Sequence, residues 1–179
     1  MKQHHVFSFL QRMGKSFMLP IAVLPVAGIF LGVGSSLTNE TTIAALHLES
    51  VLGQGTFLYS VLILLKQVGK VLFDNLPLIF AVSIALGMSK RRKEVAALAA
   101  IIAFFVMHAT INTLLCLDGS IVNGVVSNYI LDGSITSVCG MLSLEMGVFG
   151  GIVVGLGVSY LHNHFYQIQL PNVISFYEG

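Results

Sequence analysis

The chain has 179 residues, of which 55% are hydrophobic and only 9% are charged. Ordinary soluble domains carry about 25% charged residues, so a chain this apolar could not cover its own surface in water. The formal net charge is +1, and the sequence has no basic face with aromatic or polar residues of the kind that binds nucleic acid. The composition therefore predicts a membrane protein and excludes a sizeable soluble domain and a nucleic acid partner.

Apolar stretches long enough to cross a bilayer recur along the chain. No residue from Phe17 to Leu37 is charged, and a helix of this length spans a hydrocarbon core of about 30 Å. Residues 57–88 are too many for one upright crossing and include several charges, so we expect an interfacial or re-entrant helix at 57–65 before a crossing. The predicted crossings are residues 16–37, 67–88, 95–116 and 145–160. The expected fold is all-α, a polytopic transmembrane bundle of about four crossings plus that interfacial helix.

The basic residues predict how the chain is oriented. All nine Lys and Arg lie at or before Lys93, and four of them form the run at 90–93. The loops at 38–56 and 117–144 carry acidic residues and no basic ones. Loops rich in Lys and Arg stay in the cytoplasm. We therefore expect both termini and the run at 90–93 to be cytoplasmic, the acidic loops to be outside, and membrane lipid to surround the helices.

Four of the polar residues within predicted crossings are candidates for function, because polar groups there are costly and often functional. Lys70 and Asp74 are four residues apart in a helix, so they can pair on one face. A place in a transport pathway and simple extension of these side chains toward the membrane surface are both open. His108 and Asn112 also share a face, and there an interhelical hydrogen bond is favoured over a substrate contact. All four are candidate pathway or structural residues.

Glycines at four-residue spacing predict close approach between helices. Such spacing produces a flat strip on which a second helix can lie. The helix-packing candidates are Gly28, Gly32, Gly147, Gly151 and Gly155. The spacing fits both packing within one bundle and packing between two copies of the chain.

No pattern typical of catalysis or metal binding occurs in the sequence. His162 and His164 are two residues apart, so in a helix they point away from each other, and no Cys, Asp or Glu is near them. The run Gly-Lys-Ser at 14–16 resembles the end of a phosphate-binding loop, but residue 9 is Phe where that motif requires Gly. We therefore expect no catalytic residue, no metal and no cofactor.

Three segments carry a resemblance to one protein family. The first is Gly-Lys-Ser-Phe-Met-Leu-Pro-Ile-Ala-Val-Leu-Pro-Val-Ala-Gly-Ile at 14–29, and the second is Phe-Asp-Asn-Leu-Pro-Leu-Ile-Phe-Ala at 73–81. The third combines Gly-Val-Phe-Gly-Gly-Ile at 147–152 with His-Asn-His-Phe-Tyr-Gln-Ile-Gln-Leu-Pro at 162–171. In order and spacing they resemble enzyme IIC (EIIC) of the bacterial phosphotransferase system (PTS), in its glucose, maltose and N-acetylglucosamine group. The loop at 117–144 leans toward the maltose/glucose branch.

The resemblance implies a sugar permease of the bacterial cytoplasmic (inner) membrane. Such permeases form homodimers and carry a sugar inward while a phosphocysteine on an EIIB domain or protein phosphorylates it. The family's main sugar-binding residues belong to its C-terminal half, beyond residue 179, so none is assigned here. We expect residues 1–179 to be the N-terminal part of an EIIC domain, without an EIIB or EIIA domain, acting as a scaffold in phosphoenolpyruvate-dependent sugar uptake together with the C-terminal EIIC half.

Two alternatives remain open from the sequence. A truncated membrane interaction protein could dimerise with relatives through its glycine strips and transport nothing. An independent four-helix channel could instead use Lys66, Lys70 and Asp74 as its pathway. These alternatives leave open whether the chain takes part in an enzymatic reaction.

Overall fold

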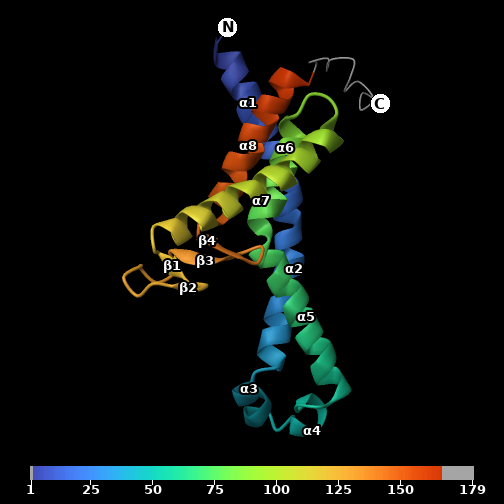
Figure 1. The fold of residues 1–179 in the computed structure, drawn as a ribbon. Coiled ribbons are helices and arrows are strands. Elements are labelled where there is room, and N and C mark those ends of the chain that lie inside the picture. Colours follow the sequence, from blue (N-terminus) through green and yellow to red (C-terminus); the bar gives the residue numbers. More distant parts are fainter. Residues whose placement is uncertain (1, 167–179) are drawn as a thin grey trace, which may run out of the picture.

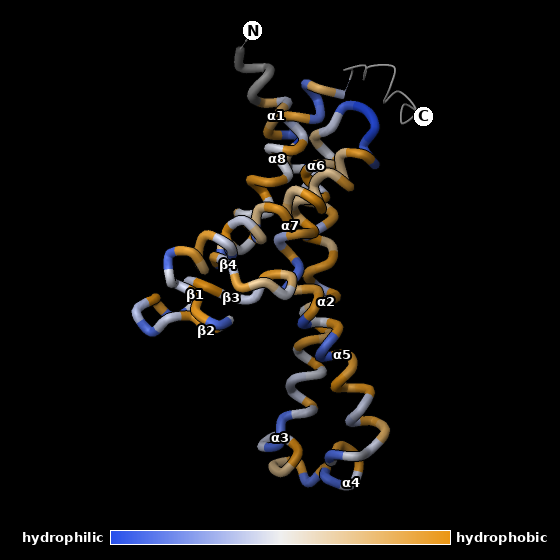
Figure 2. Tube along the Cα trace, in the orientation of Figure 1, coloured by the Kyte–Doolittle hydropathy of each residue, from blue (hydrophilic) through white to orange (hydrophobic). Residues whose placement is uncertain are grey.

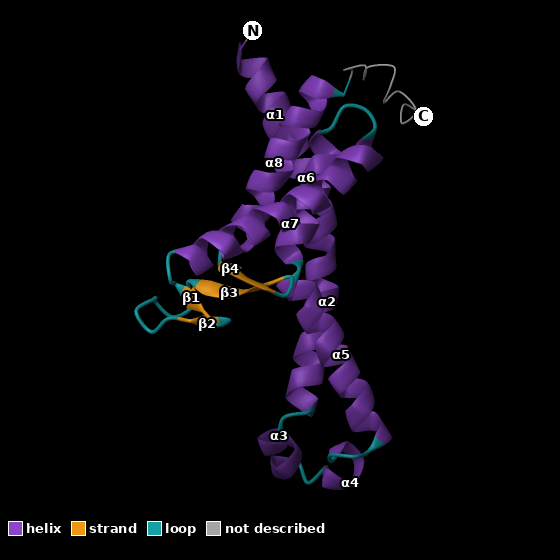
Figure 3. Cartoon of the chain, in the orientation of Figure 1, coloured by secondary structure: helices purple, strands orange, loops and turns teal. Residues whose placement is uncertain are grey.

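The structure is a computed structural model that describes residues 2–166 (Figure 1). Its helices are α1 Lys2–Ser16, α2 Met18–Leu37, α3 Glu40–Ala45, α4 Glu49–Leu52, α5 Phe57–Asp74, α6 Leu76–Met88, α7 Lys93–Leu117 and α8 Gly147–Phe165. Its strands are β1 Ile121–Val122, β2 Val125–Val126, β3 Ile135–Val138 and β4 Met141–Leu144. Helix dominates, as Figure 3 shows, and the predicted all-α fold is confirmed apart from these short strands.

The described chain has two parts. The head consists of α1, α6, α7, α8 and the strands, and the arm is residues 18–74, in which α2 and α5 run side by side away from the head (Figure 1). The short helices α3 and α4 close the far end of the arm, where Ile43, Leu52 and Leu62 form a small buried cluster. The loop predicted at 38–56 therefore contains this helical tip.

The junction between arm and head is a helix break at Asn75. Pro77 is in the first turn of α6, and proline lacks an N–H and clashes with the carbonyl four residues earlier in a continuous helix. Asn75 ends α5, and its side-chain Nδ2 donates to the Val71 carbonyl at 2.8 Å. The axes of α5 and α6 are bent by 54° at this point.

The predicted division of residues 57–88 near Lys66 is therefore wrong. Helix α5 runs without interruption through Lys66 and ends at Asp74. A lysine can lay its aliphatic stem along an apolar neighbour and extend its charge outward, so its charge does not stop a helix. Helix α5 of the arm therefore contains both the predicted interfacial helix at 57–65 and residues 67–74, the start of the predicted crossing at 67–88.

Helix α8 lies on α6 through two of the predicted packing glycines. A Cβ atom on Gly151 would meet the Pro77 carbonyl oxygen at 1.9 Å, and one on Gly155 would meet the Ala81 carbonyl oxygen at 2.7 Å. Backbone atoms cannot yield to such an overlap, so these two positions require glycine. Gly147 is different, because it begins α8 with φ of 51° and its Cβ position is close only to Glu145.

In the arm the close contacts are made by glycines that the sequence analysis did not select. A Cβ on Gly69 of α5 would lie 2.5 Å from the Leu31 backbone nitrogen of α2, and one on Gly34 would lie 2.7 Å from Lys66. Beyond the adjacent residues and backbone of α2 itself, no atom of the described chain lies within 4 Å of the Cβ positions of the predicted strip of Gly28 and Gly32. This strip faces away from α5.

The loop predicted at 117–144 folds into two antiparallel hairpins. Ile121 pairs with Val126 in the first, and Ile135 pairs with Leu144 in the second. Each turn consists of two residues with positive φ, Asn123-Gly124 in one and Cys139-Gly140 in the other. This backbone geometry matches the twist of paired strands, and glycine or asparagine adopts it most readily.

Two helical segments among the described residues are long and apolar enough to cross a membrane: Phe7–Leu37 and Lys93–Leu117. The bent pair α5 and α6 is a third if it counts as one broken span. Helix α8, near the predicted crossing at 145–160, is not in this set, so the structure supports two or three of about four predicted crossings. Figure 2 shows the apolar residues along arm and head and the hydrophilic loop before α7.

Candidate functional site

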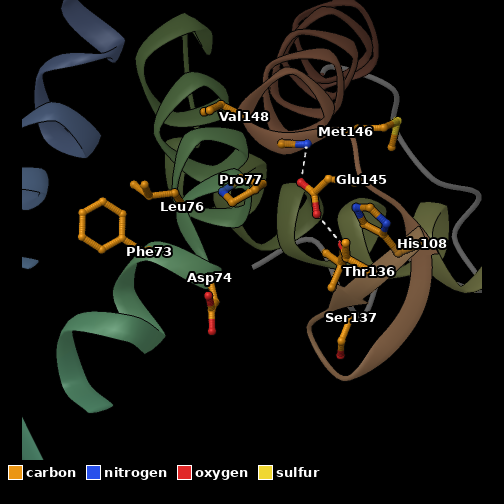
Figure 4. A pocket seen from close by; sticks show the side chains of 12 residues that line it. Phe73, Asp74, Leu76, Pro77, His108, Thr136, Ser137, Glu145, Met146 and Val148 are labelled. Carbon is orange, nitrogen blue, oxygen red and sulfur yellow. Dashed lines mark hydrogen bonds between the residues drawn. The ribbon is translucent and has the colours of Figure 1, made fainter. Parts of the chain in front are cut away.

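A pocket of about 410 Å³ lies in the head where four segments meet (Figure 4). These are the α5–α6 junction, α7, the β3–β4 hairpin and the residues that lead into α8. The polar side chains that line the pocket are Asp74, His108, Thr136, Ser137 and Glu145. They come from positions far apart in sequence, and the break at Asn75 is what places the end of α5 beside the hairpin.

His108 and Asn112 fasten the β3–β4 hairpin to α7. His108 is 1% exposed, and its Nδ1 is 2.7 Å from the Ser143 hydroxyl. One turn further along α7, Asn112 Nδ2 donates to the Leu142 carbonyl at 2.7 Å. The ring of Phe104, 4.5 Å from the His108 ring centre to centre, covers its other side. A polar group buried this deeply is costly without a partner, so these bonds keep the hairpin in place.

Glu145 connects the hairpin to the start of α8. One carboxylate oxygen accepts the Thr136 hydroxyl, and the other accepts the Gly147 backbone N–H at 3.0 Å (Figure 4). A helix start carries unsatisfied N–H groups and partial positive charge, so a carboxylate is favourable there. Glu145 therefore stabilises the first turn of α8 while it holds strand β3.

The turn of the same hairpin contacts the helix break. Cys139 Sγ donates to Asn75 Oδ1 at 3.4 Å. Burial raises the pKa of the Cys139 thiol, because a low-dielectric surrounding disfavours the thiolate. The thiol therefore keeps its proton near neutral pH and remains a donor to Asn75. The break between α5 and α6 is thus tied to the head by a side chain 64 residues away.

Comparison with known proteins gives the family. The family model described as "Phosphotransferase system, EIIC" matches residues 14–179. The PTS system glucose-specific EIICBA component of Staphylococcus saprophyticus is 37% identical over 174 residues, which is 97% of this chain. The chain belongs to the EIIC family. It spans 24% of the length of that staphylococcal relative. The family recognised from the three sequence segments is therefore confirmed.

The EIIC chain brings three of the four predicted polar residues close to the hairpin and leaves one outside. Asp74 and His108 line the pocket, and Asn112 lies beside it on α7. Lys70 is exposed on α5 and does not line the pocket. Although Lys70 and Asp74 share a helix face, no ion pair joins them in the described structure. The hydrogen bonds of His108 and Asn112 reach a strand, where the sequence analysis favoured a second helix.

The pocket of this EIIC chain offers hydrogen-bonding groups. Hydroxyl and carboxylate groups can hold a polar molecule or water. Among the described residues, no three His, Cys, Asp or Glu side chains come together in a group that could hold a metal. In the third motif segment, residues 167–171 lie outside the described part of the chain.

Sequence reasoning missed Ser143, Glu145 and Asn75 as members of this EIIC pocket network. The pattern around Ser143 carried no such signal, because this serine stands between Leu142 and Leu144, where alternation predicts a solvent-facing position, and it is fully buried. One signal was present for Asn75. Asn75 stands two residues before Pro77, which is typical of a helix start.

Proposed function

We propose that this chain is the N-terminal scaffold part of a PTS sugar permease that takes part in phosphoenolpyruvate-dependent uptake and phosphorylation of a glucose-type sugar. The observation that carries the proposal is the EIIC family match over residues 14–179. The relative's printed name, glucose-specific EIICBA component, supports glucose as the sugar. Maltose and N-acetylglucosamine are the other candidates implied by the resemblance. Because the chain spans 24% of that relative, the activity belongs to the whole permease.

The proposed setting is the bacterial inner membrane, with both termini and the basic run at 90–93 in the cytoplasm. The arrangement of the chain supports this orientation, since the start of α1, the loop before α7 and the end of α8 lie at one end of the molecule (Figure 1). The run of four basic residues in that loop belongs on the cytoplasmic side by the positive-inside rule. At this side an EIIB domain or protein would meet the permease and phosphorylate the sugar.

Within this permease, we assign His108 and Asn112 a structural role. Both form hydrogen bonds with the β3–β4 hairpin. His108 is also too deeply buried to touch a sugar without a rearrangement. Asp74 lines the pocket and forms no ion pair in the described structure, so it is the better candidate for a pathway residue. The main sugar contacts come from the C-terminal EIIC half, and homodimer contacts come from this half.

The test is uptake of radiolabelled glucose, maltose and N-acetylglucosamine by bacteria that lack their own enzymes II. One strain expresses the protein at the length its gene encodes, with a matching EIIB and the general phosphotransfer proteins. A second strain expresses residues 1–179 alone. The proposal expects glucose phosphate in the first strain and none in the second. Omission of EIIB from the first strain is the matched control and abolishes accumulation.

Two outcomes contradict the proposal. Sugar phosphate in the second strain would show that this half contains a complete site. A gene-length protein that is inserted in the membrane and takes up none of the three sugars would favour the alternative of a membrane interaction protein. That alternative is supported by the outward-facing strip of Gly28 and Gly32, which leaves room for a helix of a relative.

A further inference from the structure

A second pocket, at the opposite end of the head from the hairpins, is lined by basic groups. Its volume is about 730 Å³, and its walls come from α1, from the residues that follow α6 and from the end of α8. The basic side chains that line it are Arg12, Lys90 and His164. None of the described residues that line it is acidic. A concave site lined by one sign of charge concentrates ions of the opposite sign.

Backbone contacts hold the three walls in fixed positions. Asn163 on α8 accepts the Lys90 backbone N–H at 2.8 Å and donates to the Met88 carbonyl at 3.0 Å. On the other side α1 crosses α6 closely, because a Cβ on Gly87 would meet the Ser16 hydroxyl oxygen at 1.9 Å. The backbones that carry Arg12, Lys90 and His164 are thereby positioned before any ligand arrives.

Four of the other seven residues that line the pocket are apolar or aromatic, and three are polar. Phe9, Met88 and Leu156 contribute to its lining, and Tyr160 stands at its side with 73% of its surface exposed. Exposed apolar residues continue along α1, since Leu10 is also open. Tyrosine is enriched where a helix passes from hydrocarbon to headgroups. A ligand that suits this pocket therefore has a negative head and an apolar body.

We propose that this basic pocket binds the headgroup of an anionic phospholipid, with its phosphate between Arg12 and Lys90 and its acyl chains along α1 and α8. A soluble phosphate would use the basic groups and leave the apolar lining unused, whereas a phospholipid satisfies both. Basic pockets between transmembrane helices on the cytoplasmic side suit such headgroups. The inference goes beyond sugar transport and rests only on the proposed membrane orientation.

The test counts the lipids that the protein retains. The protein, at the length its gene encodes, is reconstituted in bilayer discs containing equal amounts of phosphatidylglycerol and phosphatidylcholine, and native mass spectrometry then measures both lipids on each chain. The wild type retains phosphatidylglycerol in preference to phosphatidylcholine. Each basic side chain near a membrane surface contributes enough to change affinity about fivefold. Arg12→Gln with Lys90→Gln therefore lowers phosphatidylglycerol retention about 25-fold.

Two matched variants control for charge and folding. Lys15→Gln removes the same charge from the same helix at a position that does not line the pocket, so retention stays at the wild-type level. Arg12→Lys keeps the charge, so this single variant retains most of the wild-type amount of phosphatidylglycerol. Equal retention of the two lipids by the wild type would overturn the proposal. An unchanged preference in the double variant would do the same.

A last experiment distinguishes a lipid phosphate from a soluble phosphate. Inorganic phosphate in the millimolar range is added to the loaded protein before measurement. A membrane lipid anchored by its chains stays bound, whereas release of the lipid would overturn the assignment in favour of a soluble phosphate. Lipid retention is measured without sugar or EIIB, so failure here is separate from failure of sugar uptake.

Discussion

The arm and the head are both rich in apolar residues (Figure 2), yet they bury very different amounts of them. In the head, Ala81, Ala85, Ala96 and Ala100 are fully buried where α6, α7 and α8 meet. In the arm, α2 buries only Pro20, Ala27 and Gly34 over its 20 residues. The difference follows from the number of neighbours, because a helix with one partner covers one narrow stripe and a helix with two covers most of its circumference.

This comparison shows that apolarity and burial are separate properties in a membrane protein. Lipid tails are as apolar as leucine, so an exposed apolar face costs nothing there. What stabilises the head is close packing together with hydrogen bonds such as those of His108 and Asn112 to the hairpin. What the arm offers is a large outward face, including the strip of Gly28 and Gly32, that lipid or another polypeptide can cover.

The largest expected effect tests close packing in the head. In Gly151→Ala the new methyl group overlaps the Pro77 carbonyl, so α6 and α8 must separate. Overpacking against backbone lowers the free energy of unfolding by about 3 kcal/mol. The measurement is thermal unfolding in detergent. Gly32→Ala in the arm is the matched control, and it stabilises by about 0.5 kcal/mol because the site is open and alanine favours helix. An equal loss of stability in both variants would contradict the proposed difference in packing between the head and the arm.

A somewhat smaller loss follows from emptying a buried position. Phe104 is 1% exposed in the head, whereas Phe57 is 85% exposed at the start of α5. Phe104→Ala leaves a cavity among Ala81, Val138 and Val154, and costs about 2 kcal/mol. Phe57→Ala changes the free energy of unfolding by less than about 0.5 kcal/mol. If chemical unfolding gives a lower free energy of unfolding for Phe57→Ala than for Phe104→Ala, the proposed contrast in packing is wrong.

A double-mutant cycle measures how much the buried hydrogen bond between His108 and Ser143 contributes to the stability of the head. His108→Ala and Ser143→Ala each remove one side of the buried hydrogen bond. We expect a coupling free energy of about 1 kcal/mol between the two positions. The same cycle between His108 and Lys70, which does not line the pocket, serves as the control and gives no coupling. Zero coupling for His108 and Ser143 would mean that the hairpin is held by packing alone.

The smallest expected effect concerns the loop after α7. Hydrogen bonds from the Ser120 side chain, and to a smaller extent from its backbone N–H, hold the pKa of Asp118 below its usual value. A carboxyl with a lowered folded pKa contributes stability at neutral pH, and that contribution is lost as the pH falls below about 4 toward the folded pKa. Unfolding midpoints of wild type and Asp118→Ala should therefore converge on acidification. A constant difference between them would contradict this assignment.

The sequence predicted best those elements that depend on one continuous run of residues. The crossing predicted at 95–116 corresponds to α7, Lys93–Leu117, because residues 95–116 are mostly apolar and contain no charged residue. In residues 57–88 the prediction placed the helix break at a charged residue, Lys66, instead of at the proline. Lys66 lies within α5, and the break belongs to Asn75 and Pro77, since a missing N–H interrupts a helix and a surface lysine does not.

The hairpins and the pocket network show a different limit. The Asn123-Gly124 pair between short apolar runs is a strong hairpin signal and could have been used. The face shared by His108 and Asn112 was predictable from their spacing. Their partners, Ser143 and Leu142, are 35 and 30 residues further along the chain. Only the tertiary arrangement brings these pairs together, so local pattern could not identify them.

The bend at Asn75 makes the arm a lever. Helix α5 has 18 residues, so its far end is about 27 Å from the bend. A rotation of about 10° at Asn75 would shift that end by about 5 Å, which is close to one helical turn. Because the Cys139 thiol bonds to Asn75 at the pivot, one weak hydrogen bond bears on an angle whose small changes become large displacements at the tip of the arm.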